Sequence, residues 1–214
     1  MQPLEMKQLK EQIVKYIRVK ILKGEYPEGF ELVQENIASE LAVSRMPVRE
    51  ALQILEQEGY IERMRNRHMR VVGLSRDSIK AHGRLLSAMA SEIAVMMIER
   101  HYGMARLNNA YHTLRAAVQS GAGHETLLKL EKDVHKQFYF DGLGLFAFQQ
   151  YERMLISFWM LAEIRGSYDP AQGHVLLGEI MANLETGKTQ ALYDGFRKYY
   201  DNVIEALIKD DSNE

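Results

Sequence analysis

The chain of 214 residues contains no cysteine, which excludes disulfides, thiolate metal sites and cysteine nucleophiles. It also lacks a run of about 18 apolar residues, so we expect no membrane span and no membrane partner. The first twenty residues are amphipathic and charged, unlike the apolar core of a signal peptide. With 46% hydrophobic and 26% charged residues, the composition is typical of a soluble globular protein. We therefore expect a cytoplasmic protein.

Positive charge is not in excess, because the net charge is −2. Residues 1–73 hold 12 Lys and Arg against 11 Asp and Glu, whereas residues 74–214 hold 15 against 18. Within IERMRNRHMR (residues 61–70), four arginines and a histidine accompany one glutamate. A local basic patch of this kind is sufficient for contacts with phosphate groups.

Hydrophobic periodicity predicts three helices in the first part of the chain. The first runs from about Leu4 to Lys23, and GEYPEGFEL follows it as a turn-rich connector. The second starts near Gln34, and only a few residues separate it from the third. The apolar positions expected on the inner faces are Leu9, Ile13, Tyr16, Ile17, Ile21, Ile37, Ala38, Leu41, Val48, Ala51, Leu52 and Leu55.

The stretch SRMPVREALQILEQEGYI (residues 44–61) carries the third helix. Ser44 is expected at its N-cap, and Pro47 is tolerated in its first turn. Arg45, Arg49 and Gln53 share the solvent-facing stripe, because residues four apart stack on a helix surface. Gly59 ends the helix. YIERM and MRVV then predict two short strands of a hairpin whose tip lies at residues 66–67.

Beyond Ser75 the sequence changes to long helical segments separated by Gly, Pro and Ser, with VGLSRD (residues 72–77) as the boundary. We predict a mainly α protein with an N-terminal winged helix-turn-helix domain over residues 1–73. Residues 76–210 are predicted to form an antiparallel helical bundle. Its six expected helices cover about residues 76–100, 104–120, 124–141, 144–165, 171–185 and 188–209.

In a winged helix-turn-helix fold, the second helix of the motif enters the major groove of DNA. Arg45 and Arg49 then lie where one guanidinium can contact guanine O6 and N7 and the other a phosphate. ILKGEYPEGFEL, ENIASELAVSRMPVREALQILEQEGYI and the basic hairpin closely resemble the GntR family of bacterial transcriptional regulators. The second half resembles the FadR-type branch of that family, whose helical domain binds a small effector.

The resemblance implies a DNA-contacting set on the third helix and on the hairpin, the wing. This set consists of Ser44, Arg45, Met46, Pro47, Arg49 and Gln53 from the helix, with Arg67 and His68 from the wing. The sequence departs from the family pattern at two turns. Ala42 stands where the family usually has glycine, and Asn66-Arg67-His68 replaces a common glycine at the wing tip. Asn66 tolerates a positive φ angle.

FadR-type domains often hold a metal through an acidic residue, a histidine four positions later and further histidines on the last two helices. Glu131 and His135 match the first pair, whereas Leu177 and Tyr199 occupy the two other positions. His174, one turn before Leu177, is a substitute ligand, so the metal set is Glu131, His135 and His174. The alternative for the first pair is a buried hydrogen-bonded contact. Because a tyrosine hydroxyl is protonated at neutral pH and donates well to a carboxylate, we expect metal affinity to be weak or lost.

For an effector carboxylate, Arg84 near the start of the bundle is the best partner, because a buried arginine favours a bidentate anion. The wider effector-binding set is Arg84, Glu131, His135, Tyr139, Arg153, Trp159, His174 and Tyr199. For Arg84, Tyr139, Arg153, Trp159 and Tyr199 individually, a surface or core role is the alternative.

Together these patterns predict a DNA-binding transcriptional regulator, and the resemblance implies a repressor that is modulated by a small organic acid or sugar acid. It would act as a homodimer on a near-palindromic operator, because such domains commonly bind two half-sites with two subunits. One alternative is a metal-dependent hydrolase using Glu131, His135 and His174, although the sequence contains no H-E-x-x-H motif, Ser-His-Asp set or Gly-rich phosphate loop. Another is a protein-binding adaptor with a degenerate winged helix.

Overall fold

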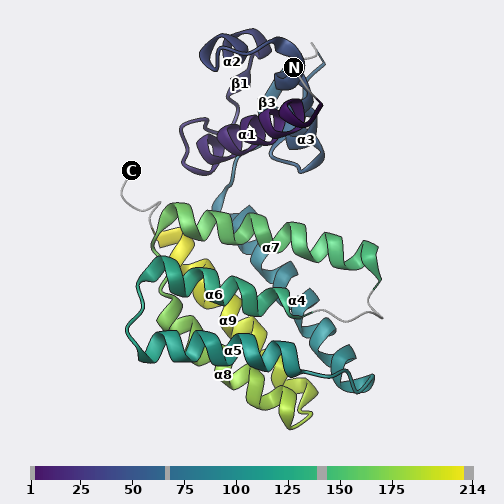
Figure 1. Cartoon of the computed structure of the whole chain (residues 1–214), viewed down its shortest axis with the longest axis vertical. Helices are drawn as coiled ribbons and strands as arrows, with labels where there is room; N and C mark the ends of the chain where they lie inside the picture. Colours follow the sequence, from purple (N-terminus) through teal and green to yellow (C-terminus); the bar gives the residue numbers. More distant parts are fainter. Residues whose placement is uncertain (1–2, 66–67, 139–143, 210–214) are drawn as a thin grey trace. The chain divides into compact units, whose positions relative to one another are not determined.

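The computed structural model describes residues 3–65, 68–138 and 144–209. The chain divides into two compact units, an N-terminal unit (Met1–Ser75) and a helical unit (Arg76–Glu214), which Figure 1 colours from purple to blue and from blue to yellow. Each unit is described by itself below.

The N-terminal unit holds three helices and a small sheet. Its elements are α1 (Pro3–Leu22), β1 (Glu31–Leu32), α2 (Gln34–Glu40), α3 (Arg45–Gln57), β2 (Ile61–Arg63) and β3 (Met69–Val71). The three helices confirm the predicted ones. Helix α3 packs against α1, and the predicted inner positions Val48, Ala51, Leu52 and Leu55 of α3 are fully buried. Apolar periodicity therefore set the orientation of α3 correctly.

The antiparallel sheet has the strand order β1-β3-β2. Strands β2 and β3 are the predicted hairpin, whereas β1 lies in the segment interpreted as a turn-rich connector. β1 has two residues, of which Glu31 is exposed and Leu32 is buried. A strand this short gives no alternating pattern over four to eight residues and could not be detected by periodicity. It adds a third strand at the base of the wing.

The helical unit consists, over the part of the chain that the structure describes, of six helices packed as a bundle (Figure 1). They are α4 (Arg76–Glu99), α5 (Ala105–Gln119), α6 (His124–Lys136), α7 (Leu145–Arg165), α8 (Pro170–Glu185) and α9 (Thr189–Lys209). Helix α9 packs against α4, α7 and α8. The fold class predicted from the sequence is confirmed. The prediction for the third helix of the bundle was too long, because α6 ends at Lys136 and residues 139–141 lie outside the described residues.

The core of the bundle is rich in aromatic side chains. Tyr151, Phe158, Trp159, Phe196 and Tyr200 are each at most 2% exposed. No helix among the described residues has the length and apolar character that crossing a membrane requires.

Candidate functional site

The turn between α2 and α3 is a Schellman motif with alanine at its left-handed position. The Val43 N–H donates to the Ala38 carbonyl at 2.9 Å, and the Ala42 N–H donates to the Ser39 carbonyl at 3.2 Å. Ala42 has a φ of 52°, a conformation in which Cβ crowds the carbonyl oxygen. The same motif ends α3, where Gly59 has a φ of 81°. The departure from the family glycine therefore leaves the turn formed but strained.

Ala42→Gly should raise the free energy of unfolding of the N-terminal unit by about 0.5–1 kcal/mol, since glycine removes the left-handed strain but gives the unfolded chain more freedom. Urea unfolding of the full chain, followed by circular dichroism, measures this change. Gly59→Ala is the matched control: no atom lies within 4 Å of the added Cβ, so it should lower stability through φ alone. A decrease in stability for Ala42→Gly would contradict this interpretation of the turn.

Helix α3 presents its polar stripe to solvent as predicted. Arg45, Met46, Arg49 and Gln53 are all exposed, and Met46 is 44% exposed although it is apolar. Pro47 is buried in the first turn. Ser44 occupies the N-cap, but its side chain makes no capping hydrogen bond, so its hydroxyl is not committed to the end of the helix.

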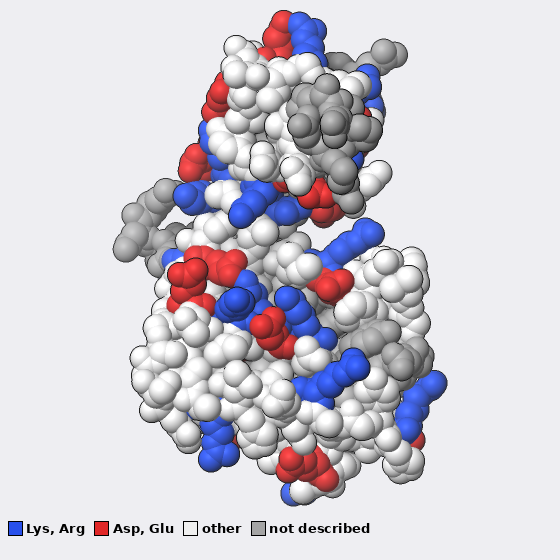
Figure 2. Space-filling view, in the orientation of Figure 1, with Lys and Arg blue, Asp and Glu red and all other residues white. Residues whose placement is uncertain are grey.

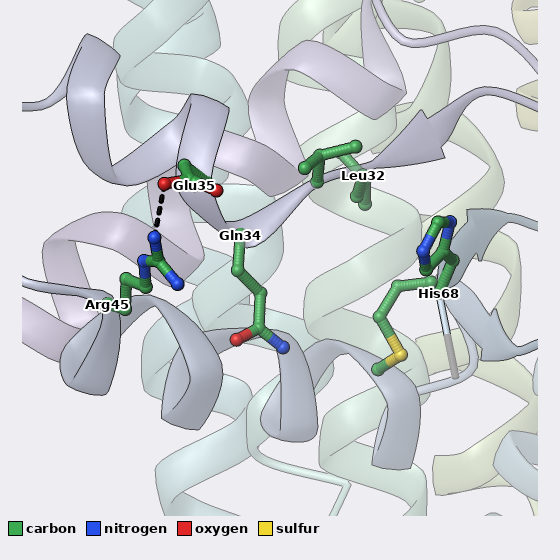
Figure 3. Close-up of a pocket in the computed structure, with 7 residues that line it drawn as sticks. Leu32, Gln34, Glu35, Arg45 and His68 are labelled. Carbon is green, nitrogen blue, oxygen red and sulfur yellow. Dashed lines mark hydrogen bonds and ion pairs between the residues drawn. The ribbon is translucent and has the colours of Figure 1, made fainter. Parts of the chain in front are cut away.

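Arg45 forms an ion pair with Glu35, in the first turn of α2. The pair borders a groove lined by residues from β1, α2, α3 and the wing (Figure 3), namely Leu32, Val33, Gln34, Glu35, Arg45, His68 and Met69. Arg49, one turn further along α3, has no ion-pair partner among the described residues. Glu35 was not predicted from the sequence to lie on this surface.

Two of the four arginines in the basic patch of residues 61–70, and its histidine, lie against acidic side chains. Arg63 pairs with Glu56 at 3.1 Å, Arg70 pairs with Glu62, and His68 Nδ1 lies 3.3 Å from a Glu31 carboxylate oxygen. Figure 2 shows acidic and basic side chains intermixed on the face in view. The patch is therefore less positive than its sequence suggests. Arg67 and Asn66 of the wing tip lie outside the described residues.

In the helical unit, the predicted effector residues divide between surface and core. Arg84 is exposed on α4 and Arg153 is exposed on α7, so the interpretation of Arg84 as a buried carboxylate partner is wrong. Tyr139 lies outside the described residues. The core members are Trp159, Tyr199, Glu131 and His135, each at most 1% exposed.

Glu131 lies at the centre of a buried hydrogen-bonded cluster. Its Oε1 accepts hydrogen bonds from the Tyr168 hydroxyl at 2.7 Å and from the Tyr199 hydroxyl at 2.8 Å. Tyr199 thus donates to a carboxylate of its own chain. Burial raises the pKa of Glu131 to about 8, against the opposing effect of the two tyrosine hydrogen bonds. The carboxyl group is therefore largely protonated at neutral pH.

His135 lies within the same cluster, one turn after Glu131 on α6. Its ring centre is 4.9 Å from that of Tyr199 and 5.5 Å from that of Trp159. Burial lowers its pKa to about 3, so the imidazole is neutral. Within the described part of the chain, Glu131 Oε2, His135 Nε2 and Trp159 Nε1 are buried without a hydrogen-bond partner. Such buried polar atoms retain the capacity to hydrogen-bond a water or a small polar ligand.

These residues do not fit a metal centre. His174 is only half-buried and stacks on Tyr111, with ring centres 5.8 Å apart and planes inclined by 9°, instead of joining Glu131 and His135. No group of three His, Cys, Asp or Glu side chains among the described residues could hold a metal ion. The predicted metal set of Glu131, His135 and His174 is therefore not assembled.

Tyr168 and Gly173 belong to the cluster, although the sequence analysis did not identify them. A Cβ atom at Gly173 would lie 1.8 Å from the Tyr168 hydroxyl oxygen and 2.1 Å from Glu131 Oε1. Tyr168 precedes the start of α8 and Gly173 lies in its first turn. The sequence indicated this contact only through a glycine inside a predicted helix, where close packing often requires glycine.

Comparisons with known proteins agree with this architecture. Residues 9–71 match the family described as bacterial regulatory proteins, gntR family. Across the whole chain, the fold is similar to that of McbR/YncC of E. coli, with a TM-score of 0.65, 16% identity and coverage of 95% of this chain and 99% of that one. It is also similar to Lar, described as controlling the agr system of Listeria monocytogenes, with a TM-score of 0.64, 13% identity and coverage of 92% and 95%.

A GntR regulator from Rhodococcus sp. RHA1 gives a TM-score of 0.57 at 17% identity, over 93% of this chain and 97% of that chain. At these identities the structural likeness establishes the fold alone. No curated protein sequence matches the chain. The family match runs from within α1 to the end of β3 and includes the helix-turn-helix and the wing. Through residues 9–71 the chain carries a DNA-binding domain of the gntR family of bacterial regulatory proteins, which supports a DNA-binding transcriptional regulator.

Proposed function

We propose that the chain is a dimeric transcriptional repressor that places α3 in the major groove of its operator. The observation that carries this proposal is the exposed row of Arg45, Arg49 and Gln53 on a helix whose opposite face is fully buried. Of two guanidinium groups four residues apart, one can contact the O6 and N7 atoms of a guanine while the other binds a phosphate.

The wing is proposed to contact the DNA backbone beside the groove. The ion pairs of Arg63 and Arg70 leave fewer free positive charges on it than the sequence suggests, so phosphate attraction alone is weak. Because the electrostatic attraction to phosphates supplies most non-specific binding, we expect modest affinity for arbitrary DNA and a greater dependence on base contacts.

We propose that the chain dimerises through the helical unit. Helices α4 and α7 pack against each other, with His82 Nε2 of α4 lying 2.9 Å from the Met154 carbonyl of α7. Each helix also exposes a large apolar side chain: Leu85 is 57% exposed and Ile156 is 46% exposed. Apolar side chains on neighbouring helices favour burial against a second copy. Two subunits would then bind two half-sites, which makes the operator a near-palindrome.

The variant Leu85→Asp, Ile156→Asp should weaken the dimer by about tenfold or more, because each substitution places a charge in the proposed interface. Sedimentation of the full chain over a concentration series measures the effect. Val175→Asp is the control, since Val175 is an equally exposed apolar residue (58%) on α8. If the double variant dimerises as tightly as the wild type, the interface lies elsewhere.

For the effector, we propose the buried cluster of Glu131, His135 and Trp159. The sequence predicted a small organic acid or sugar acid as the effector, but the charges around the cluster favour an uncharged molecule. No Lys or Arg is among the groups that shift the pKa of Glu131 or His135, so an effector carboxylate would find no compensating charge there. The cluster suits an uncharged polar molecule, including the protonated form of an organic acid. Binding would alter operator affinity by shifting the population of DNA-competent dimers.

Selection from a random duplex library with the full chain tests the proposed function. The expected result is enrichment of one near-palindromic sequence whose half-sites lie about one helical turn apart. Effectors can then be screened through the fluorescence of Trp159, the only tryptophan, with His135→Ala expected to lose the response while keeping DNA affinity. Failure to enrich any sequence would favour the adaptor with a degenerate winged helix.

A further inference from the structure

The ion pair between Glu35 and Arg45 joins the first turns of the two helices of the helix-turn-helix motif (Figure 3). A hydrogen bond runs from Arg45 Nη2 to Glu35 Oε1. The two side chains are 66% and 67% exposed, and they border the groove between the start of α3 and the wing residue His68. An acidic side chain therefore lies on the surface proposed to meet DNA.

Fold stability does not account for this pair. An ion pair between side chains as exposed as these contributes about 0–1 kcal/mol, because water screens it and both side chains lose freedom. Its position suggests an effect on binding instead. An arginine has five N–H donors in a rigid fork; Glu35 accepts from Nη2, so the other nitrogens stay available for a base.

We propose that Glu35 is a positioning residue that sets sequence discrimination, by holding the Arg45 guanidinium for one base contact and keeping it from arbitrary phosphates. This inference rests on the proposed contact between Arg45 and DNA. Because the guanidinium is already held, less side-chain freedom is lost when it meets the correct base. Binding to any other sequence depends mainly on electrostatic attraction to the phosphates. The negative charge of Glu35 close to those phosphates therefore opposes non-specific binding.

The two effects act in opposite directions on the two kinds of DNA. Removal of the charge at Glu35 should tighten binding to arbitrary duplexes, since Arg45 becomes free to contact phosphates. Binding to the correct sequence should change little, because the gain in electrostatic attraction is offset by the loss of orientation. The ratio of the two affinities, rather than either affinity alone, therefore reports the role of Glu35.

The experiment compares full-length wild type, Glu35→Gln, Arg45→Ala and the double variant on two duplexes, by fluorescence anisotropy over a salt series. One duplex is the sequence selected by the wild type and the other is its scrambled form. Glu35→Gln should lower the ratio of affinities by about threefold to tenfold, mainly through tighter binding to the scrambled duplex, and should steepen the salt dependence there by up to about one ion. In the Arg45→Ala background the same substitution should leave the ratio nearly unchanged.

Glu58→Gln is the matched control. Glu58 also pairs with an arginine of the N-terminal unit, Arg18 at 2.5 Å, but it lies at the other end of α3, and its substitution changes the net charge equally. If Arg45→Ala leaves the ratio unchanged, the proposed DNA contact of Arg45 fails. If Arg45→Ala lowers the ratio but Glu35→Gln behaves like Glu58→Gln, or acts equally in both backgrounds, the contact stands and the role of Glu35 is overturned.

Discussion

Gly173→Ala should destabilise the helical unit by about 3 kcal/mol. The added Cβ would lie 1.8 Å from the Tyr168 hydroxyl oxygen and 2.1 Å from Glu131 Oε1. Both side chains are fully enclosed, with 2% and 0% exposure, so neither can swing into solvent. Overpacking of this kind costs about 1–3 kcal/mol. Loss of the buried hydrogen bond between Tyr168 and Glu131 lowers the free energy of unfolding by about a further 1–3 kcal/mol. The better helix propensity of alanine offsets about 1 kcal/mol of this loss.

Gly178→Ala provides the comparison within the same helix. Its Cβ would lie 2.5 Å from the Tyr111 hydroxyl oxygen, but Tyr111 is only half-buried and can move aside. The gain in helix propensity is the same, so the difference between the two variants isolates the packing against the Glu131 cluster. Urea unfolding followed by the fluorescence of Trp159 measures both. Equal stability of the two variants would mean that the cluster is not the rigid, enclosed assembly described above.

The free energy of unfolding should fall as the pH rises from about 6.5 to 8, because of Glu131. Burial raises the pKa of this carboxyl from 4.5 in the unfolded chain to about 8. Between these values the folded state keeps the proton and the unfolded state has lost it. Stability then decreases with pH by up to about 1.4 kcal/mol per unit for this group.

His135 has the opposite effect at lower pH. Its pKa falls from 6.5 to about 3 on folding, so between these values the unfolded state binds the extra proton and stability rises with pH. The two contributions oppose each other between about pH 4.5 and 6.5. For this pair of groups we therefore expect a plateau of stability there, with losses on both sides.

Glu131→Gln separates the two contributions. The amide oxygen can still accept hydrogen bonds from Tyr168 and Tyr199, but the group no longer titrates. The difference in unfolding free energy between wild type and variant should change by about 2 kcal/mol in the variant's favour between pH 6.5 and 8. Glu179→Gln, at an exposed residue of α8 paired with Lys198, is the charge-matched control. A pH-independent difference between Glu131→Gln and wild type would show that Glu131 is ionised in the folded protein.

Patterns within single elements could be predicted from the sequence. The inward face of α3, the position of Ser44, the end of the helix at Gly59 and the six helices of the bundle all follow from periodicity and turn residues. The resemblance to the GntR family also drew attention to Ala42, because glycine is usual at this position of the turn.

Contacts between elements could not be predicted. The ion pairs of Glu35 with Arg45 and of Glu56 with Arg63 depend on how α2, α3 and β2 pack together. A count of charged residues along the sequence cannot show which charges are paired. Likewise, Tyr168 lies 37 residues after Glu131, and nothing in either local sequence indicates their hydrogen bond. The spacing of Glu131 and His135 was consistent with both a metal pair and a buried polar pair. Only the surrounding tyrosines and the stacking of His174 on Tyr111 favour the second.

The most direct test of the central claim, that the exposed arginines of α3 contact operator bases, is the operator affinity of Arg45→Ala and Arg49→Ala. Fluorescence anisotropy with the selected duplex and its single-base variants measures it. Arg106→Ala, at an exposed arginine of α5, controls for the loss of one positive charge. If an arginine makes a bidentate base contact, its removal should weaken operator binding by about 1–3 kcal/mol and relax preference at one base pair. Unchanged operator affinity in both Arg45→Ala and Arg49→Ala would contradict the assignment of α3 as the recognition helix.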